Sequence, residues 1–278
     1  MTLQSLIHKL HVMFAKSNFI VFVAIKLRNQ LNAIINFSIC RSSGFLSSGE
    51  TKFLEKIADE IETFIDVGAH VGDYTEFLLN TKKQRKQKIN ALLFEPSENA
   101  FNYLKTKFTD CDNVEIIQYA VGSKEGSAIF YDVFHYSGGT GSSFAFENLA
   151  DIDSLSSYQV DITTITHQIN QRNWNKIDFL KIDAEGYDFK VLEGCQALLE
   201  EKRIRVVQFE YTTKWLYLGD TLIYALKFLE SFGYSVYLLN SNGLSKFNYE
   251  LYAPSLKYAN FVAFSPKDLT KFTRYIPN

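Results

Sequence analysis

The sequence has few cysteines for its length: Cys40, Cys111 and Cys195 are the three among 278 residues. An odd number at such wide spacing forms neither a disulfide framework nor a pair of metal ligands, which is typical of proteins from a reducing compartment. The five histidines also lack the spacing of a zinc signature. We therefore expect a cytoplasmic protein, and we predict no metal centre from these residue types.

Long apolar runs are missing as well. The longest, residues 19–25, ends before Lys26 and Arg28, whereas a membrane-spanning helix needs about 20 apolar residues. The first residues are polar at Gln4 and Ser5 and lack the layout of a secretory signal peptide. These absences favour a soluble protein.

The sequence has no excess of basic residues. Its 29 Lys and Arg face 31 Asp and Glu, for a net charge of -2, whereas nucleic-acid-binding proteins usually carry a basic surface. We therefore predict no nucleic-acid partner. One compact basic run is interpreted as a solvated loop between two elements; it consists of Lys82, Lys83, Arg85, Lys86 and Lys88.

Apolar residues make up 46% of the chain, enough for one large domain and an appendage. We assign residues 1–46 to a helical extension and residues 47–278 to the main domain, with a Gly/Ser-rich linker at 41–49. The extension is expected to pack on the main domain or on a dimer partner. Peripheral membrane contact is the alternative, because the polar faces carry basic residues. Two amphipathic helices are predicted from apolar residues at helical spacing, namely Leu3, Leu6, Ile7, Leu10, Met13 and Phe14, then Ile20, Ala24, Leu27, Leu31 and Ile34.

Beyond the linker, short apolar runs alternate with helical patterns, which predicts a mostly parallel sheet covered by helices on both faces. A glycine-rich stretch at 138–141 is interpreted as a lid over the site or as an ordinary surface loop. The predicted strands are 63–67, 91–95, 114–120, 128–131, 179–183, 206–210, 235–239 and 260–264. The predicted helices are 51–61, 73–79, 97–108, 188–200 and 221–232, the last followed by Gly233 as a stop.

The most informative segment joins the first predicted strand to its helix. The strand leads through Asp66 to a tight turn bracketed by Gly68 and Gly72, at the sheet edge where open α/β sheets bind ligands. Glu95 ends the next strand, 23 residues after Gly72, close to the spacing at which an acidic residue binds ribose hydroxyls. The alternative is that these residues merely shape the turn.

The same turn favours S-adenosyl-L-methionine (SAM) over a dinucleotide. The dinucleotide fingerprint needs G-x-G-x-x-G, whereas three residues, His70 among them, separate Gly68 from Gly72. A carboxylate at Asp66 would repel a pyrophosphate and attract the ammonium of a methionine moiety. We therefore predict SAM as the cofactor. The alternatives are an NAD-dependent oxidoreductase and a nucleotide-binding protein without catalysis.

A second polar cluster accompanies the predicted strand 179–183. Lys181 and Asp183 share one face of this strand, Glu185 follows it, and Glu210 ends the next strand. Carboxylates gathered at one sheet edge are costly unless they are paired, hydrated or functional. We interpret the cluster as the acceptor side of a catalytic site. The alternative is a structural ion pair of Lys181 with a carboxylate, while Glu185 caps the next helix.

Taken in order, these motifs resemble the FkbM family of methyltransferases. The resemblance covers roughly residues 51–266 and is carried by residues 66–72, 94–96, 119–122, 181–186 and 209–210. It implies a Rossmann-like class I methyltransferase fold, α/β with a mostly parallel seven-stranded sheet flanked by helices. It also implies SAM-dependent O-methylation of a hydroxyl on a sugar, glycan, glycolipid or related small molecule.

The resemblance further implies roles for individual residues. Val121 and Gly122 would lie near the adenine, and Asp183 and Glu185 would face the reaction centre. His70 departs from the family pattern, in which asparagine is common at this position. The cofactor-binding residues implied by the resemblance are Asp66, Gly68, Ala69, His70, Gly72, Glu95, Pro96, Val121, Gly122 and Asp183.

Methyl transfer to a hydroxyl is helped by a group that takes the proton as the C–O bond forms. Asp183 is the first candidate for this base, with Lys181 holding it ionised. Glu185, Glu210 and His70 are the alternatives. A rival hypothesis has Asp183, Glu185 and Glu210 binding Mg²⁺, because hard oxygen ligands suit this ion.

Overall fold

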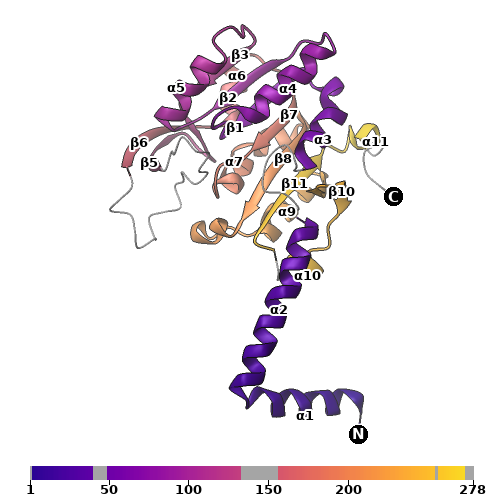
Figure 1. The fold of residues 1–278 in the computed structure, drawn as a ribbon. Coiled ribbons are helices and arrows are strands. Elements are labelled where there is room, and N and C mark those ends of the chain that lie inside the picture. The colour runs from indigo at the N-terminus through magenta and orange to yellow at the C-terminus, as the bar shows by residue number, and fades with distance from the viewer. Residues whose placement is uncertain (1, 40–48, 133–155, 254–255, 273–278) are drawn as a thin grey trace.

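The computed structural model describes residues 2–39, 49–132, 156–253 and 256–272. Its centre is a sheet of eight strands in the order β10-β9-β11-β8-β7-β1-β2-β3 (Figure 1). The five strands from β8 to β3 run parallel, while β11 is antiparallel to both of its neighbours and β10 is antiparallel to β9. The strands are β1 Thr63–Val67, β2 Asn90–Phe94, β3 Val114–Ile117, β7 Ile177–Ile182, β8 Ile204–Thr212, β9 Ser235–Asn240, β10 Gly243–Lys246 and β11 Tyr258–Phe264.

Helices cover both faces of this sheet, as predicted. Side chains alternate between two apolar clusters: Phe64 of β1 packs with the cluster that includes Phe53 and Leu78, and Ile65 packs with the cluster that includes Leu192 and Leu226. The first face carries α3 Gly49–Ile57, α4 Asp73–Gln84 and α5 Glu98–Lys107. The second face carries α6 Ile165–Gln171, α7 Asp188–Gly194, α8 Gln196–Glu200 and α9 Leu222–Ser231. Shorter elements are η2 Ala58–Glu60, η5 Thr213–Leu218, α10 Tyr249–Tyr252 and α11 Leu269–Phe272.

The arrangement confirms the predicted Rossmann-like class I methyltransferase fold. Seven strands, from β9 to β3, make up the expected mostly parallel sheet, and β10 extends it as an eighth strand hairpinned onto β9. Helix ends follow the local sequence: Ser97 caps α5 by accepting a hydrogen bond from the Ala100 amide, and Gly233 follows α9 with φ +76°. The predicted stop at Gly233 is therefore confirmed.

A second sheet of three strands was not anticipated. The predicted strand 114–120 is two strands, because β3 ends at Ile117 and β4 (Ala120–Val121) pairs with β6 (Ser156–Thr163). The predicted strand 128–131 is β5 (Gly126–Asp132), which also pairs with β6 and not with the central sheet. Strand β6 was missed, although Tyr158, Val160 and Ile162 alternate with polar residues as a half-buried strand requires.

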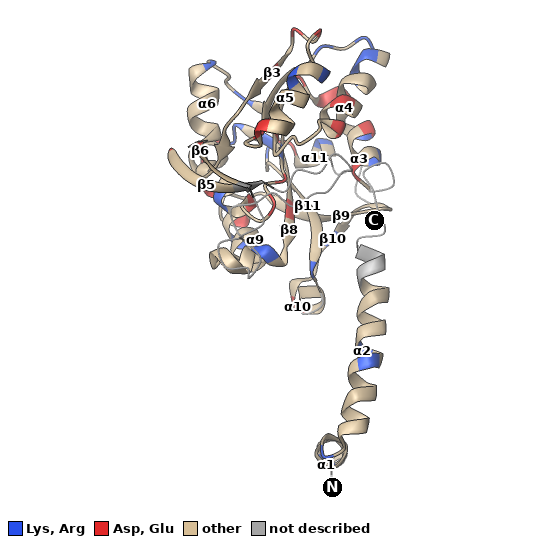
Figure 2. Ribbon diagram, turned by 60° about the vertical axis from the view of Figure 1, so that its left-hand side comes forward, with Lys and Arg blue, Asp and Glu red and all other residues tan. Residues whose placement is uncertain are grey.

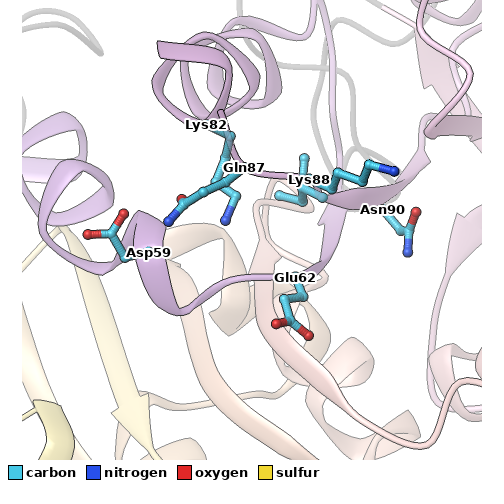
Figure 3. A pocket seen from close by; sticks show the side chains of 7 residues that line it. Asp59, Glu62, Lys82, Gln87, Lys88 and Asn90 are labelled. Atoms are coloured by element: carbon cyan, nitrogen blue, oxygen red, sulfur yellow. The ribbon is translucent and has the colours of Figure 1, made fainter. Parts of the chain in front are cut away.

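The basic run is in part the solvated loop that was predicted, because Arg85, Lys86 and Lys88 are exposed between α4 and β2, whereas Lys82 and Lys83 belong to α4. Lys82 lies in the last turn of α4, is buried, and donates a hydrogen bond to the Ala58 carbonyl at 3.1 Å. Arg85 pairs with Asp59 at 2.8 Å. Together with Glu62, Gln87, Lys88, Ile89 and Asn90, Asp59 and Lys82 line a pocket of about 350 Å³ (Figure 3). This pocket adjoins the amino ends of β1 and β2, opposite the edge where α/β sheets bind ligands.

The extension forms two helices, α1 Leu3–Ala15 and α2 Asn18–Ile39, which project from the domain (Figure 1). Neither helix has a buried residue up to Ile34, and Ile35 alone among the described side chains of α2 packs partly against the core. Of the two predicted partners of the extension, the main domain is therefore excluded for all but the end of α2, and a dimer partner stays a prediction. Of the described residues, no single helix is long and apolar enough to span a membrane; α1 and α2 reach that length only as a pair bent by 108°.

Candidate functional site

The parallel strands bring the two predicted motifs to one edge of the sheet. Strand β1 lies between β2 and β7, and Asp66 of β1 pairs in register with Lys181 of β7, which in turn pairs with Gln208 of β8. Residues in register point to the same face of a sheet, so these three side chains form a row. Strand β7, which carries the acceptor-side cluster, thus lies directly beside the strand that leads into the glycine turn.

Glycine at position 68 is required by a close approach of two loops. Gly68 has φ +75°, and a Cβ there would lie 1.9 Å from the carbonyl oxygen of Asp183. The amides of Gly68 and Ala69 both donate to the Phe94 carbonyl at the end of β2, at 2.9 and 3.1 Å. The turn is thus attached to β2 on one side and pressed against the loop after β7 on the other. Gly72, with φ +76°, then starts α4.

Asp66 lies beneath this turn and has no exposed surface. One carboxylate oxygen accepts a hydrogen bond from the Thr75 hydroxyl at 2.7 Å. The other oxygen is buried without a hydrogen bond, 3.5 Å from the Lys181 ammonium. Burial raises the pKa of the Asp66 carboxyl, and Lys181 and Thr75 oppose that shift. The geometry makes Asp66 a buried anchor below the turn. Its contact with a cofactor ammonium stays a prediction.

Glu95 lies beside the same turn, one strand further along the sheet. Its two carboxylate oxygens accept hydrogen bonds from the backbone amides of His70 (2.7 Å) and Ser97 (2.9 Å). Pro96, half-buried, follows directly. The structure therefore places Glu95, 5% exposed, against the glycine turn. Its contact with a ribose stays a prediction.

Asp183 is the most accessible carboxylate of the acceptor-side cluster, with 37% of its side chain exposed. Lys181 donates to it at 3.1 Å and lies over the ring of Tyr74 at 5.0 Å. Burial disfavours the charge on Lys181, but the carboxylates of Asp183 and Asp66 outweigh it and raise the pKa of the ammonium. The predicted ion pair is confirmed, and it leaves Asp183 facing solvent while its cation is buried.

Glu185 forms an ion pair that the sequence did not predict. It pairs with Lys214 of η5 and has φ +49°, in the left-handed region. It does not cap the following helix. Asp188 instead accepts hydrogen bonds from the amides of Ala184 (3.4 Å), Gly186 (3.2 Å) and, across from β8, Glu210 (3.3 Å).

Asp188 was missed as a site residue, although an aspartate at the start of a helix is a common capping signal. It is fully buried, and burial together with the nearby Asp183 raises its pKa to about 7. Its three backbone bonds join the loop after β7 to β8. The side chain therefore sets the positions of Asp183 and Glu185 without facing solvent itself.

The raised pKa of Asp188 predicts a pH-dependent contribution to stability. The unfolded chain titrates near 3.8 and the folded one near 7, so the stabilisation is complete below pH 3.8 and is lost as pH rises through 7. The difference in unfolding free energy between the protein and Asp188→Asn should fall by up to about 1.4 kcal/mol per pH unit across this range. Urea unfolding at several pH values measures it, and a constant difference would contradict the assignment.

Glu210 and His70 complete the cluster. Burial raises the pKa of Glu210 well above its usual value, and Asp183 and Asp188 add to the shift. Burial lowers the pKa of His70, with Asp183, Glu185 and Asp73 opposing, so the imidazole is neutral at neutral pH. Within the described part of the chain, no group of three or more His, Cys, Asp or Glu is arranged to hold a metal ion.

Val121 and Gly122 lie beside the loop that follows β7, since a Cβ on Gly122 would come within 3.1 Å of the Tyr187 ring. Both are buried, and the Gly122 amide donates to the Thr163 carbonyl of β6 at 2.9 Å. A Cβ on Gly194 of α7 would lie 2.2 Å from the Gly122 oxygen, so this loop packs tightly against a helix. Contact of Val121 or Gly122 with an adenine remains a prediction. The glycine-rich stretch at 138–141 falls outside the described residues.

Comparison with known protein families agrees with this geometry. The model of the methyltransferase FkbM domain matches residues 66–236, more than half of the chain. The chain belongs to the FkbM methyltransferase family. The matched region contains the glycine turn, Glu95 and the whole acceptor-side cluster. No individual curated protein matches the chain.

Solved structures of methyltransferases resemble this FkbM protein only distantly. The FkbM methyltransferase of Methylobacillus flagellatus KT shares 15% identity and a TM-score of 0.45, covering 74% of this chain and 44% of its own. An rRNA methylase of Streptococcus thermophilus is 14% identical with a TM-score of 0.40, and the match covers 77% of this chain and 93% of the methylase. A TehB-like SAM-dependent methyltransferase of Corynebacterium glutamicum is 12% identical with a TM-score of 0.41, and the match covers 87% of this chain and 96% of that protein. The present chain thus spans less than half the length of the Methylobacillus protein.

Proposed function

We propose that this FkbM methyltransferase binds SAM and methylates a hydroxyl of a sugar, glycan, glycolipid or related small molecule in the cytoplasm. The observation that carries the proposal is the acidic edge of the sheet beside the glycine turn. The carboxylates of Asp183, Glu185 and Glu95 lie there, with the cations Lys181 and Lys214. Glu210 lies among them, with a raised pKa that favours its neutral form. Such an edge would repel the pyrophosphate of a dinucleotide and suits a cofactor that carries sulfonium and ammonium charges.

The residues present fit such a cofactor. Close packing at Gly68 holds the turn against the loop after β7, and Glu95, bonded to the His70 amide of the same turn, would accept hydrogen bonds from ribose hydroxyls. The bound cofactor would supply a methyl group on a sulfonium. Asp183 would accept the hydroxyl proton as the new O–C bond forms and the S–C bond breaks. Lys181 would hold the Asp183 carboxylate in place, and His70, neutral at neutral pH, is the alternative base.

Parallel calorimetric titrations with SAM and NAD test the cofactor. We expect SAM binding and no NAD binding. Binding of NAD alone would favour an oxidoreductase. SAM binding without transfer of labelled methyl groups to glycan and lipid extracts of the source organism would favour a binding protein that lacks catalysis.

Glu95→Ala should weaken SAM binding at least about tenfold. Hydrogen bonds to a charged acceptor contribute roughly 1.5–3 kcal/mol each, and each factor of ten corresponds to about 1.4 kcal/mol. Glu98→Ala, at an exposed position three residues along on α5, is the matched control and should bind normally. Calorimetry on both folded variants decides; equal affinities would remove Glu95 from the cofactor site.

A further inference from the structure

The two helices of the extension, α1 and α2, here called the arm, expose apolar side chains to solvent over most of their length. Phe19 is 74% exposed, Leu27 60% and Ile34 67%. Contiguous apolar surface of this kind marks an interaction site. The arm also exposes Leu3, Leu6, Ile7, Leu10, Val12, Met13, Phe14, Ile20, Val21, Phe22, Val23, Ile25 and Leu31.

The charge on the arm has one sign. Residues 2–39 contain Lys9, Lys16, Lys26 and Arg28, but none of the chain's 31 Asp and Glu. Figure 2 shows blue and no red on α1 and α2, whereas the body carries both colours. The arm therefore has a net charge of +4 within a chain of net charge -2. Anionic lipid headgroups attract basic segments of this kind.

The charge of the arm distinguishes an anionic lipid surface from a second copy. Each arm carries four cations and no carboxylate, so two arms packed together would bring like charges close to one another. Anionic headgroups instead place opposite charge beside the same lysines and arginine. We propose that the arm binds the surface of an anionic lipid membrane.

The bend makes a peripheral position more favourable than a span. α1 and α2 meet at 108°, and of the described residues no single helix can span a membrane. Two helices that meet at an angle share one plane, as an interface requires. Amphipathic helices with basic polar faces lie in such interfaces with their apolar side chains among the acyl chains.

The arm joins the body at the edge that carries the candidate site. Helix α2 contacts β9, and β9 ends at the same edge of the sheet as β8, because both strands are antiparallel to β11. Figure 1 shows α2 leaving the domain next to α10. Exposed apolar side chains continue along this edge at Leu216 and Leu251. Membrane binding by the arm would hold this edge near the lipid.

Vesicle sedimentation with the full-length protein tests the proposal. We expect binding to vesicles of phosphatidylcholine with phosphatidylglycerol, weakened by salt, and little binding to phosphatidylcholine alone. Phe19→Asp combined with Phe22→Asp should weaken binding at least about tenfold, because two large apolar side chains no longer enter the interface. Lys26→Gln and Arg28→Gln should each weaken it roughly fivefold.

Ile129→Asp is the control, since it places one of the two added charges at a 44% exposed apolar position on β5 of the body; it should bind like the unmodified protein. Absent binding to anionic vesicles, or equal binding by all variants, overturns the proposal. A lipid-free dimer that the two phenylalanine substitutions dissociate, with no vesicle binding, would assign the arm to a second copy instead.

The shared edge also specifies an acceptor class, and this part rests on the proposed function: the methylated hydroxyl is carried by a lipid. Label from SAM should enter the organic phase of a membrane extract, and the double phenylalanine variant should transfer less than the Ile129→Asp control. Equal transfer by both, or label confined to water-soluble glycans, overturns the lipid acceptor. Calorimetric titration with SAM in the absence of lipid tests the two proposals separately. If SAM does not bind, the proposed function is refuted, while vesicle binding by the arm still stands.

Discussion

Asp183→Asn is expected to reduce kcat for methyl transfer about a hundredfold or more, which is within the usual range for loss of a general base. The substitution keeps the shape of the side chain and removes its basicity. The carboxylate is 37% exposed at the sheet edge and is held by Lys181 at 3.1 Å. SAM affinity should change little, because the ribose is assigned to Glu95. The measurement is labelled methyl transfer at saturating SAM with the best hydroxyl acceptor.

Asp161→Asn is the matched control for this variant. It makes the same substitution at an exposed position of β6, in the second sheet, and should retain full activity. Near-normal turnover in a folded Asp183→Asn protein would exclude Asp183 and turn attention to His70 and Glu185. Treatment with EDTA separates base from metal: activity that is lost and then restored by Mg²⁺ supports a divalent ion held by the carboxylates.

Lys181→Met is expected to lower the free energy of unfolding by about 3–5 kcal/mol at pH 8, the usual cost of breaking a buried pair by removing one partner. The ammonium is buried beside the fully buried Asp66. The loss should be smaller near pH 5, because burial already raises the pKa of Asp66 and protonation then removes the unpaired charge. Urea unfolding at both pH values measures the difference.

Two further variants check that interpretation. Lys105→Met, at an exposed position of α5, should change stability by no more than about 0.5 kcal/mol. Adding Asp66→Asn to Lys181→Met should recover part of the loss at pH 8, because the buried charge is gone. A loss that is equal at both pH values and unaffected by Asp66→Asn would mean that Lys181 contributes through packing alone.

Much of the fold could be read from local patterns. Periodicity located all seven strands that form the methyltransferase sheet, and capping signals located helix ends such as Gly233. The glycine turn and the Lys181–Asp183 pair were also predictable, because each lies within a few residues of chain. Strands β3 and β4 were merged into one since two short apolar segments in succession look like a single strand. Their separation depends on β6, which lies about 40 residues further on.

Roles within the site depended on contacts between distant residues. From its residue type and its place near the end of β1, Asp66 could equally be an exposed ligand or a buried anchor; Thr75 and Lys181 pack around it and make it the anchor. From the sequence, Asp188 is an ordinary first residue of a helix. In the structure, the hydrogen bond that it accepts from the Glu210 amide joins the loop after β7 to β8.

The sequence specifies which side chains are available and which neighbours they meet along one helix or strand, because those forces act over a few residues. It therefore sufficed for the family, the layers of the fold and the residues gathered at the sheet edge. Burial and pKa depend on what packs from elsewhere in the chain. Only the folded structure could therefore show that Asp183 faces solvent while Asp66 does not, and that the arm stands away from the body at the edge of the site.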